Sequence, residues 1–349
     1  MLFNLPDDQV LYRALVARDP GYEGRVFVGV KTTGIFCRLT CPARKPKPEN
    51  CQFYETAGQC LEAGFRPCKR CFPLQPAADA DPMIATLLNA LEARGEHRWR
   101  ESDVQAMGLD PSTVRRSFKR QFGMTFLEMA RHRRLRDGFL TLSGGGKVIE
   151  AQVTAGFDSA SAFRTAFARL LGISPSAFKQ GALLSASWID TPLGAMIAVC
   201  DNQFLHLLEF PDRKALPTEL KRLYQSSKGA IGLGRTPVTD QIEAELARYF
   251  NGDDARFQTP LAFHGSPFTQ QVWRALQTIP AGQTRSYSQV ASQIGRPTAT
   301  RAVARANGAN QIALVVPCHR VIGADGALTG YGGGLWRKQR LIEFERAYL

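Results

Sequence analysis

The distribution of cysteines constrains this chain more than any other feature. Six of the eight cysteines lie between Cys37 and Cys71, and four of them form two close pairs, Cys37-x-x-x-Cys41 and Cys68-x-x-Cys71. Each pair can chelate a metal ion from one turn, and two such turns complete a tetrahedral zinc site. Disulfides are the alternative, but Met1 to Val10 lacks the basic segment of a secretory signal, and disulfides are rare in the reducing cytoplasm. The spacing therefore predicts a small Zn²⁺-binding domain in a cytoplasmic protein.

The residues around these cysteines resemble a known family. Thr32 to Arg38, Cys41 to Arg44 and Gly64 to Cys71 are similar to the N-terminal domain of the Ada family of bacterial adaptive-response proteins. The similarity covers about residues 5–75. In that family the first cysteine accepts a methyl group from a methylphosphotriester in the DNA backbone. The resemblance therefore implies that Cys37 is a methyl acceptor as well as a zinc ligand.

Methylation of one thiolate would change how such a site interacts with DNA. Zn²⁺ with four thiolates carries a net charge of about −2, and a neutral thioether in place of one thiolate leaves about −1. Removing a unit charge a few ångströms from a phosphate is worth on the order of 1–4 kcal/mol, or about one to three decades in affinity. Methylation of one cysteine by damaged DNA would thus increase the affinity of the zinc site for DNA. Arg44 and Arg66 are candidate DNA-binding residues, and a solvated basic rim is the alternative for them.

The length and the linkers predict several domains. At 349 residues the chain is too long for one small core, and residues 74–82 and 180–187 read as linkers. A formal net charge of +13 suits double-stranded DNA as a partner, although a soluble basic protein is the alternative. No apolar run approaches the ~20 residues of a membrane span. We expect four domains, at residues 1–75, 83–181, 186–262 and 266–349.

The second of these segments has helical periodicity and no convincing strand. Asp110 and Pro111 are a strong helix start, and Val114 and Phe118 behind them share one face. A similar basic helix follows a connecting helix, and the pair resembles the AraC-type DNA-binding domain, which implies an all-α domain with two helix-turn-helix units. A plain helical bundle with solvated arginines is the alternative. The candidate DNA-binding residues of this domain are Arg116, Lys119, Arg120 and Arg164.

The third segment, residues 186–262, contains predicted strands and a helix but no motif that indicates a reaction. Residues 188–210 alternate apolar and polar side chains around two turns, which predicts a meander of strands. A helix is expected to begin at Thr239 and to end before Gly252. We expect residues 188–262 to carry no functional side chain.

A cysteine at the end of an apolar run is the second chemical feature. Val315 to Pro317 lead to Cys318, which has His319 beside it, so the thiol lies at the mouth of a core strand or turn. In the last helix Leu341 and Glu345 share one face, so Glu345 points inward and needs a partner such as His319. A Cys–His–Glu relay would supply the base and the orienting acid that a cysteine nucleophile needs. A buried, inert cysteine beside a surface histidine is the alternative.

The residues around this cysteine resemble the DNA alkyltransferases that remove methyl groups from the O6 of guanine. The similarity runs from about Ser266 to the C-terminus and includes Asn310 to Arg320 and the loop Gly330 to Gly333. It implies that Cys318 accepts methyl from O6-methylguanine and O4-methylthymine. It also implies a ribonuclease-H-like α/β domain followed by a winged-helix-like alkyltransferase domain.

The same resemblance assigns roles to individual residues. His319 and Glu345 would activate the thiol, and Asn310 would order the turn that carries it. Tyr287 would assist at the phosphate and the departing base. Arg301 would fill the space of the flipped nucleotide, with a phosphate contact as the alternative. Arg320 is a further candidate DNA-binding residue.

These observations favour one function and leave two others open. The favoured function is that of a multidomain α+β, single-turnover methylated-DNA–protein-cysteine methyltransferase that also activates transcription of the alkylation-damage response. Its partners would be alkylated and promoter DNA and RNA polymerase, and it would act as a monomer. The second is a zinc-dependent transcription factor that senses alkylated DNA without repairing it. The third is a cysteine hydrolase that uses the same three side chains.

Overall fold

The computed structural model describes residues 6–22, 26–55, 59–60, 63–68, 70–71, 73 and 82–346. Its contacts divide the chain into two compact units. The first comprises Met1–Ala90 with Ile322–Thr329, and the second comprises Leu91–Val321 with Gly330–Leu349. The four predicted domain boundaries stay a prediction.

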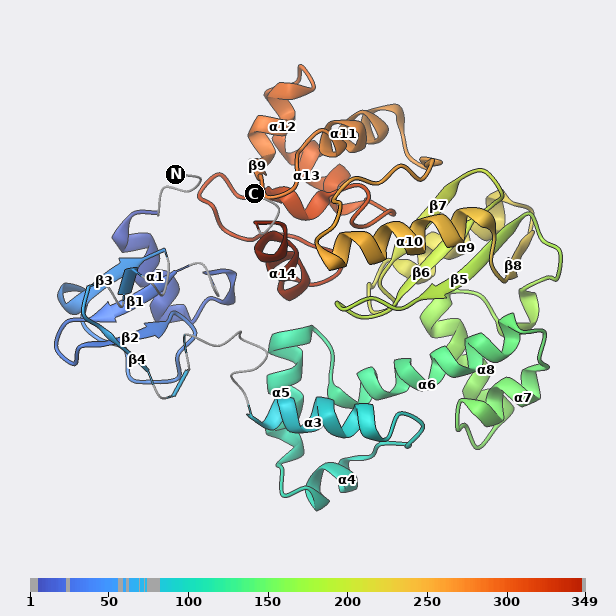
Figure 1. Ribbon diagram of the computed structural model, residues 1–349, viewed down its shortest axis with the longest axis horizontal. Coiled ribbons are helices and arrows are strands. Elements are labelled where there is room, and N and C mark those ends of the chain that lie inside the picture. The colour runs from blue at the N-terminus through green and yellow to red at the C-terminus, as the bar shows by residue number, and fades with distance from the viewer. Residues whose placement is uncertain are drawn as a thin grey trace. The chain divides into compact units, whose positions relative to one another are not determined.

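The first unit is built on a small mixed sheet, with the helix α1 packed in its core (Figure 1). The helix α1 begins where the Asp7 carboxylate accepts a hydrogen bond from the Gln9 amide, and its Leu11 and Leu15 enter the core. The strand order is β3-β1-β2-β4, with β1 antiparallel to both neighbours and β4 parallel to β2. A turn closes the β1–β2 hairpin at Gly34, whose φ of 64° favours glycine. The bounds are α1 (Asp8–Ala17), β1 (Phe27–Val30), β2 (Ile35–Arg38), β3 (Cys51–Tyr54) and β4 (Arg66–Pro67).

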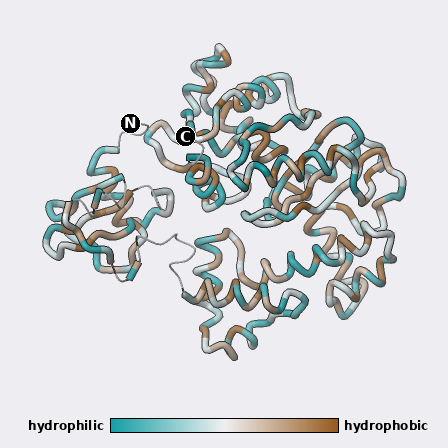
Figure 2. Tube along the Cα trace, viewed as in Figure 1, coloured by the Kyte–Doolittle hydropathy of each residue, from teal (hydrophilic) through white to brown (hydrophobic). Residues whose placement is uncertain are grey.

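The next part of the chain is helical, as its periodicity predicts. Asp110 caps α5 by accepting hydrogen bonds from the amides of Ser112 and Thr113, which confirms the predicted start. Ser159 caps α8 by accepting from the Ala162 amide. Along these helices the hydropathy alternates between hydrophilic and hydrophobic (Figure 2). Apolar side chains of α6, α7 and α8 are buried together in one core. The bounds are α3 (Pro82–Ala93), α4 (Glu101–Ala106), α5 (Pro111–Phe122), α6 (Phe126–Ser143), α7 (Val148–Thr154) and α8 (Ala160–Leu171).

A four-stranded sheet of order β7-β6-β5-β8 follows. The first three strands form the predicted antiparallel meander, and β8 returns parallel to β5 after the helix α9. Two local predictions are wrong. The linker is shorter than expected because β5 begins at Leu184, and α10 is capped by Thr236, with Thr239 inside its first turn. The bounds are β5 (Leu184–Ile189), β6 (Met196–Cys200), β7 (Leu205–Glu209), α9 (Leu216–Ser226), β8 (Ile231–Leu233) and α10 (Pro237–Asn251).

Both faces of this sheet are buried. Along β6, Ile197 and Val199 join a core with α6, α7, α8 and α9, while Met196, Ala198 and Cys200 join a second core with α10 and the helices that follow. Every residue of β6 is therefore buried, and its sequence is uniformly apolar instead of alternating. The predicted alternation fails here because side chains cover both faces.

The last part of the chain is mostly helical. The helices α11, α12 and α13 lie close to one another, and a turn leads from α13 to the short 3-10 helix η4. No helix among the described residues is long and apolar enough to span a membrane. The bounds are α11 (Pro267–Gln277), β9 (Arg285–Ser286), α12 (Tyr287–Gln293), α13 (Thr300–Gly308), η4 (Cys318–Arg320), β10 (Val321–Ile322) and α14 (Leu335–Glu345).

Arg134 of α6 should be a main support of the second helix-turn-helix unit. It is buried, donates to the carbonyls of Ala155 and Gly156, and lies over the Phe157 ring. We expect Arg134→Met to lower the free energy of unfolding by roughly 2–3 kcal/mol, because the carbonyls of Ala155 and Gly156 lose a charged donor that is itself buried. Urea denaturation followed by tryptophan fluorescence measures the change.

Arg133 provides the control on the same helix. Its partner Glu92 is mostly exposed, so Arg133→Met should cost at most about 1 kcal/mol. Equal losses in the two variants would contradict the supporting role of Arg134.

Candidate active site and metal centre

The side chain of Asn310 shapes the turn that carries Cys318. Its Nδ2 donates to the Val316 carbonyl at 2.8 Å and lies 3.0 Å from the Cys318 Sγ, and its Oδ1 accepts from the Ile312 amide at 3.1 Å. Within the turn, Leu314 has a φ of 66°, which non-glycine residues seldom adopt. The turn ends at η4, where Cys318 is only 6% exposed.

His319 and Glu345 form a buried pair, as the sequence predicts. The His319 Nε2 and the Glu345 Oε1 are 2.8 Å apart. The same carboxylate accepts from the Tyr249 hydroxyl at 2.8 Å and from the Nε and Nη2 of Arg320 at 2.8 and 2.7 Å. Burial alone would raise the pKa of Glu345, but His319 and Arg320 outweigh it and hold this pKa well below 4.5.

The thiol and the imidazole are both neutral at pH 7 in this arrangement. Burial raises the pKa of Cys318 to about 11, although the hydrogen bond from Asn310 acts in the opposite direction. Burial also lowers the pKa of His319, against the attraction of Glu345. Because Nε2 is the nitrogen at Glu345, the Nδ1 of His319 is the one left to accept a proton, and this buried atom has no hydrogen-bond partner among the described residues.

Arg320 lies where a DNA contact is hard to make. Its side chain is buried, bridges Glu345 and also donates to the Ile279 carbonyl. The predicted DNA contact is therefore not supported, because the guanidinium already binds interior acceptors. The sequence could not show this, because the residues next to Arg320 do not reveal whether its side chain faces solvent or the buried Glu345.

Two other predicted residues lie on the helices that precede the turn. Tyr287 is the first residue of α12, is partly buried, and packs against the core that contains Cys318. Its hydroxyl lies 3.8 Å from the position that a Cβ on Gly330 would occupy, so it borders the glycine-rich loop. Arg301 is the second residue of α13 and is exposed. The exposed position of Arg301 leaves it accessible to a ligand.

Lys338 belongs to the same buried region and is not predicted from the sequence. Its side chain is 0% exposed, and its Nζ donates to the Val321 carbonyl. Its positive charge acts to lower the pKa of both Cys318 and His319. A lysine on a helix is normally an exposed residue, so no local pattern indicates this burial.

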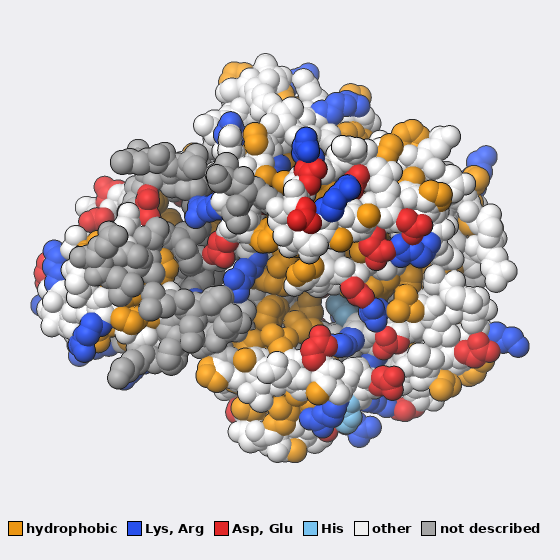
Figure 3. Space-filling model, in the orientation of Figure 1, with side chains coloured by type: hydrophobic (Ala, Val, Ile, Leu, Met, Phe, Trp, Pro, Cys, Tyr) orange, Lys and Arg blue, Asp and Glu red, His pale blue; other side chains and the backbone are white. Residues whose placement is uncertain are grey.

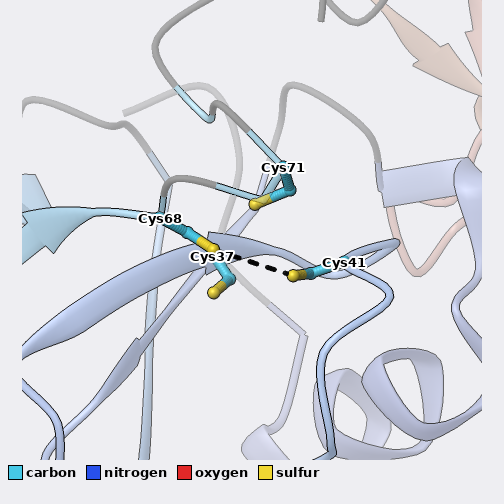
Figure 4. A group of neighbouring side chains, drawn as sticks. All are labelled: Cys37, Cys41, Cys68 and Cys71. Carbon is cyan, nitrogen blue, oxygen red and sulfur yellow. Dashed lines mark hydrogen bonds between the residues drawn. The ribbon is translucent and has the colours of Figure 1, made fainter. Parts of the chain in front are cut away.

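The four predicted zinc ligands converge in the first unit. The sulfur atoms of Cys37, Cys41, Cys68 and Cys71 all lie within 4.8 Å of one another, and all four side chains are buried (Figure 4). The sheet brings the pairs together because β4, which precedes Cys68, runs parallel to β2, which carries Cys37. Hydrogen bonds with Cys41 and burial raise the pKa of the Cys37 thiol, so a cation is needed to hold all four sulfurs as thiolates.

Backbone donors and basic side chains surround this cluster. The amide of Arg38 lies 3.4 Å from the Cys71 sulfur, and the amide of Arg70 lies 3.4 Å from the Cys68 sulfur, which suits anionic ligands. Lys45 donates from its Nζ to the carbonyls of Leu39 and Cys41 at 3.1 Å. The predicted DNA-binding residues of this unit, Arg44 and Arg66, are exposed.

The basic residues predicted on the helix-turn-helix units are also exposed. Arg116, Lys119 and Arg120 face outward from α5 while Val114 and Phe118 are buried, and Arg164 faces outward from α8. Acidic and basic side chains are interspersed on the face drawn in Figure 3. Some of these form ion pairs, as Arg115 does with Glu101, whereas no ion pair involves the predicted DNA-binding residues of α5 and α8 among the described residues.

Three family models match this chain. The metal binding domain of Ada matches residues 10–73, a helix-turn-helix domain matches residues 104–181, and the DNA binding domain of 6-O-methylguanine DNA methyltransferase matches residues 267–347. The bifunctional transcriptional activator/DNA repair enzyme Ada of Escherichia coli (strain K12) is 35% identical over 350 residues, which cover 98% of this chain and 97% of the relative. The chain belongs to the Ada family.

Other relatives agree with this assignment. The regulatory protein ada of Salmonella typhimurium is 36% identical over 356 residues, covering 98% of this chain and 97% of the relative. A methylated-DNA--protein-cysteine methyltransferase of Mycolicibacterium paratuberculosis is 46% identical over 166 residues, covering 46% of this chain and 91% of the relative. The Ada resemblance predicted from the motifs is confirmed, as are the coarse α+β organisation and the Zn²⁺ at the four cysteines.

Zinc occupancy in this Ada-family chain should depend on the four converging cysteines alone. We expect Cys68→Ala to lose the bound ion, because three thiolates no longer complete a tetrahedral site. Cys51→Ala is the matched control, since Cys51 is buried in the same core but lies outside the cluster. Elemental analysis of purified protein measures the zinc, and equal occupancy in the two variants would contradict the assignment.

Glu345 should make stability depend on pH at the acid end. Because its folded-state pKa lies below the usual 4.5, its stabilisation is present above about pH 4.5 and is lost as the pH falls through the folded value. We expect Glu345→Gln to lower the free energy of unfolding at pH 7 by roughly 3–5 kcal/mol. The variant should also lose less stability than the wild type as the pH falls below about 4.5. Denaturant titrations between pH 3 and 7 measure both effects. Glu343→Gln, on the same helix but partly exposed, should change stability by less than about 1 kcal/mol.

Proposed function

We propose that this chain is a single-turnover DNA repair methyltransferase with two acceptors. Cys318 takes methyl from O6-methylguanine and O4-methylthymine, and Cys37 takes methyl from backbone methylphosphotriesters. The second transfer switches on sequence-specific DNA binding and transcriptional activation. The observation that carries the proposal is the presence of two separate thiol sites, each with the groups that its chemistry needs, in an Ada-family chain.

At the first acceptor the proton must leave the thiol before sulfur can attack. The Nδ1 of His319 receives it, through a bridging water, and Glu345 stabilises the resulting imidazolium. Asn310 donates to the developing thiolate. The sulfur electron pair then forms the S–CH₃ bond as the C–O6 bond breaks, and its electrons restore the carbonyl of guanine. The base takes a proton at N1, which balances the proton released by the thiol.

At the second acceptor no proton has to be removed. Cys37, Cys41, Cys68 and Cys71 would hold zinc, which when bound keeps their sulfurs anionic at neutral pH. The Cys37 sulfur attacks the methyl carbon, and the C–O electron pair returns to the phosphate oxygen. The product thioether is neutral, so the cluster repels DNA less and Arg44 and Arg66 bind phosphate more effectively. Both products are stable thioethers, so each acceptor acts once.

DNA recognition requires further contacts that these residues can supply. Arg301, exposed near the start of α13, would occupy the space of the flipped nucleotide, and Tyr287 would assist at the phosphate and the departing base. The exposed basic residues of α5 and α8 would contact promoter DNA: Arg116, Lys119, Arg120 and Arg164. Activation of transcription implies contact with RNA polymerase. We infer a monomer that acts in the cytoplasm.

The strand order and the packing of the last helices support the proposed fold names. An antiparallel meander followed by a helix and a strand parallel to the first supports a ribonuclease-H-like domain at residues 186–262. The cluster of α11, α12 and α13 supports a winged-helix-like alkyltransferase domain at residues 266–349. The other proposed domains are the zinc domain at 1–75 and the AraC-type domain at 83–181.

Mapping of the transferred methyl groups tests the proposal. The zinc-loaded protein is incubated with duplexes that carry either O6-methylguanine or a methylphosphotriester, and intact mass and peptide analysis locate the added methyl. We expect methyl on Cys318 from the first duplex and on Cys37 from the second. Cys318→Ala should lose guanine repair by at least about 1,000-fold and keep methylation of Cys37.

Cys200→Ala is the control, since Cys200 is buried in the core of the sheet. Guanine repair that persists in Cys318→Ala would overturn the acceptor assignment. DNA binding without methylation of either cysteine would instead indicate a transcription factor that only senses alkylated DNA.

A further inference from the structure

A buried arginine outside the motifs reaches the turn that carries Cys318. Arg213 lies in the loop between β7 and α9, in the segment that the sequence predicts to have no functional side chain, and it is 5% exposed. Its guanidinium lies between two buried carboxylates, at 2.9 Å from Glu209 and 3.1 Å from Glu219. Such a buried cluster is costly to desolvate, so its position needs an explanation beyond packing.

The same guanidinium binds the backbone next to the acceptor. Its Nη2 donates to the Gly308 carbonyl at 3.0 Å, and its Nη1 donates to the Asn310 carbonyl. Asn310 in turn donates from its side chain to the Cys318 sulfur. Two hydrogen bonds to the end of α13 and the start of the turn therefore fix the residue whose amide contacts the thiol.

The glycine-rich loop lies against the other side of this arginine. A Cβ on Gly332 would come within 2.6 Å of the Arg213 Nε, so the absence of a side chain at Gly332 lets the loop approach the guanidinium closely. Arg213 thus contacts both the turn that holds the acceptor and the loop that borders it.

The charge of Arg213 acts on the thiol as well. It lowers the pKa of Cys318, as Lys338 does, while Glu209 acts in the opposite direction. Burial raises the pKa of Glu209 to about 8, against the attraction of Arg213, so this carboxyl holds its negative charge less firmly than an exposed glutamate does. The remaining titratable groups near the thiol are His319 and Tyr331.

We propose that Arg213 is a positioning residue for methyl transfer to Cys318, which holds Asn310 against the thiol and supplies positive charge that favours the thiolate. The inference rests on the proposed role of Cys318 as the acceptor. Arg213 touches neither the methyl group nor the base. It acts through the backbone of Asn310 and through its electric field.

Single-turnover kinetics of the full-length, zinc-loaded protein test this role. Arg213→Met and Arg213→Lys are compared with the wild type on a duplex that carries O6-methylguanine, between pH 6 and 9.5, and methyl on Cys318 is counted by mass. A second readout is the pH dependence of carboxamidomethylation of Cys318 by iodoacetamide without DNA. Arg235→Met is the matched control, because Arg235 forms a similar cluster with Asp240 and Glu243 but is exposed.

We expect Arg213→Met to transfer methyl at least about tenfold more slowly at pH 7 and to shift both pH profiles upward by about one unit, because the thiolate loses a positive neighbour. Arg213→Lys should keep the wild-type pH profile but stay several-fold slower, since an ammonium cannot span two carboxylates and two carbonyls as a planar guanidinium does. Arg235→Met should match the wild type.

Two results would overturn the role of Arg213. One is a folded Arg213→Met whose rate and pH profiles equal those of Arg235→Met. If Arg213→Met does not fold, Arg213→Lys decides, because a folded lysine variant with the wild-type rate shows that the fork of hydrogen bonds is dispensable. Failure of the wild type itself to methylate Cys318 would refute the acceptor assignment instead, so the two failures are distinguishable.

Discussion

The hydrogen bonds to the carboxylate of Glu345 are the interactions on which the proposed repair site depends. An ionised carboxylate in the interior costs several kcal/mol when it is unpaired, and here Tyr249, His319 and Arg320 all donate to it. These donors come from α10 and from η4, which are far from α14 in the sequence. The carboxylate therefore ties the last helix to the turn that carries Cys318.

The sheet β5–β8 joins the regulatory helices to the repair site. Its two faces enter two different cores, one shared with α6, α7 and α8 and the other with α10 and the helices around Cys318. The fit is close at the end of α8, where a Cβ on Gly172 would meet the Pro217 carbonyl at 2.0 Å. A sheet without a solvent face cannot lose either covering layer without exposing apolar side chains. The helix-turn-helix part and the repair part are therefore expected to unfold together rather than as independent domains.

Local interactions were predictable from the sequence, and distant ones were not. The caps at Asp110 and Ser159 involve amides two or three residues away, so the sequence shows both partners together. The pairing of Glu345 with His319 was predictable because helix periodicity turns the carboxylate inward. Arg213 was missed because its acceptor at Asn310 is 97 residues away, and only the folded sheet brings them together. The burial of Arg320 was missed for the same reason, since it depends on where Glu345 lies.

The two proposed acceptors must both provide a thiolate, and their surroundings control its formation in different ways. The sulfur of Cys37 would be kept anionic by the zinc ion that the four converging cysteines can hold. Cys318 is instead stored as a neutral thiol, since burial raises its pKa to about 11. A neutral thiol reacts slowly with adventitious electrophiles, which matters for a protein that is consumed by one turnover. Removal of its proton creates a thiolate and an imidazolium together; in the proposed mechanism Asn310 donates to the anion and Glu345 accepts from the cation, and these contacts offset part of the cost of burial. The cost of ionisation therefore falls when Asn310 and Glu345 are in hydrogen-bonding position beside the thiol and the imidazole, and we expect a flipped base to react in that arrangement.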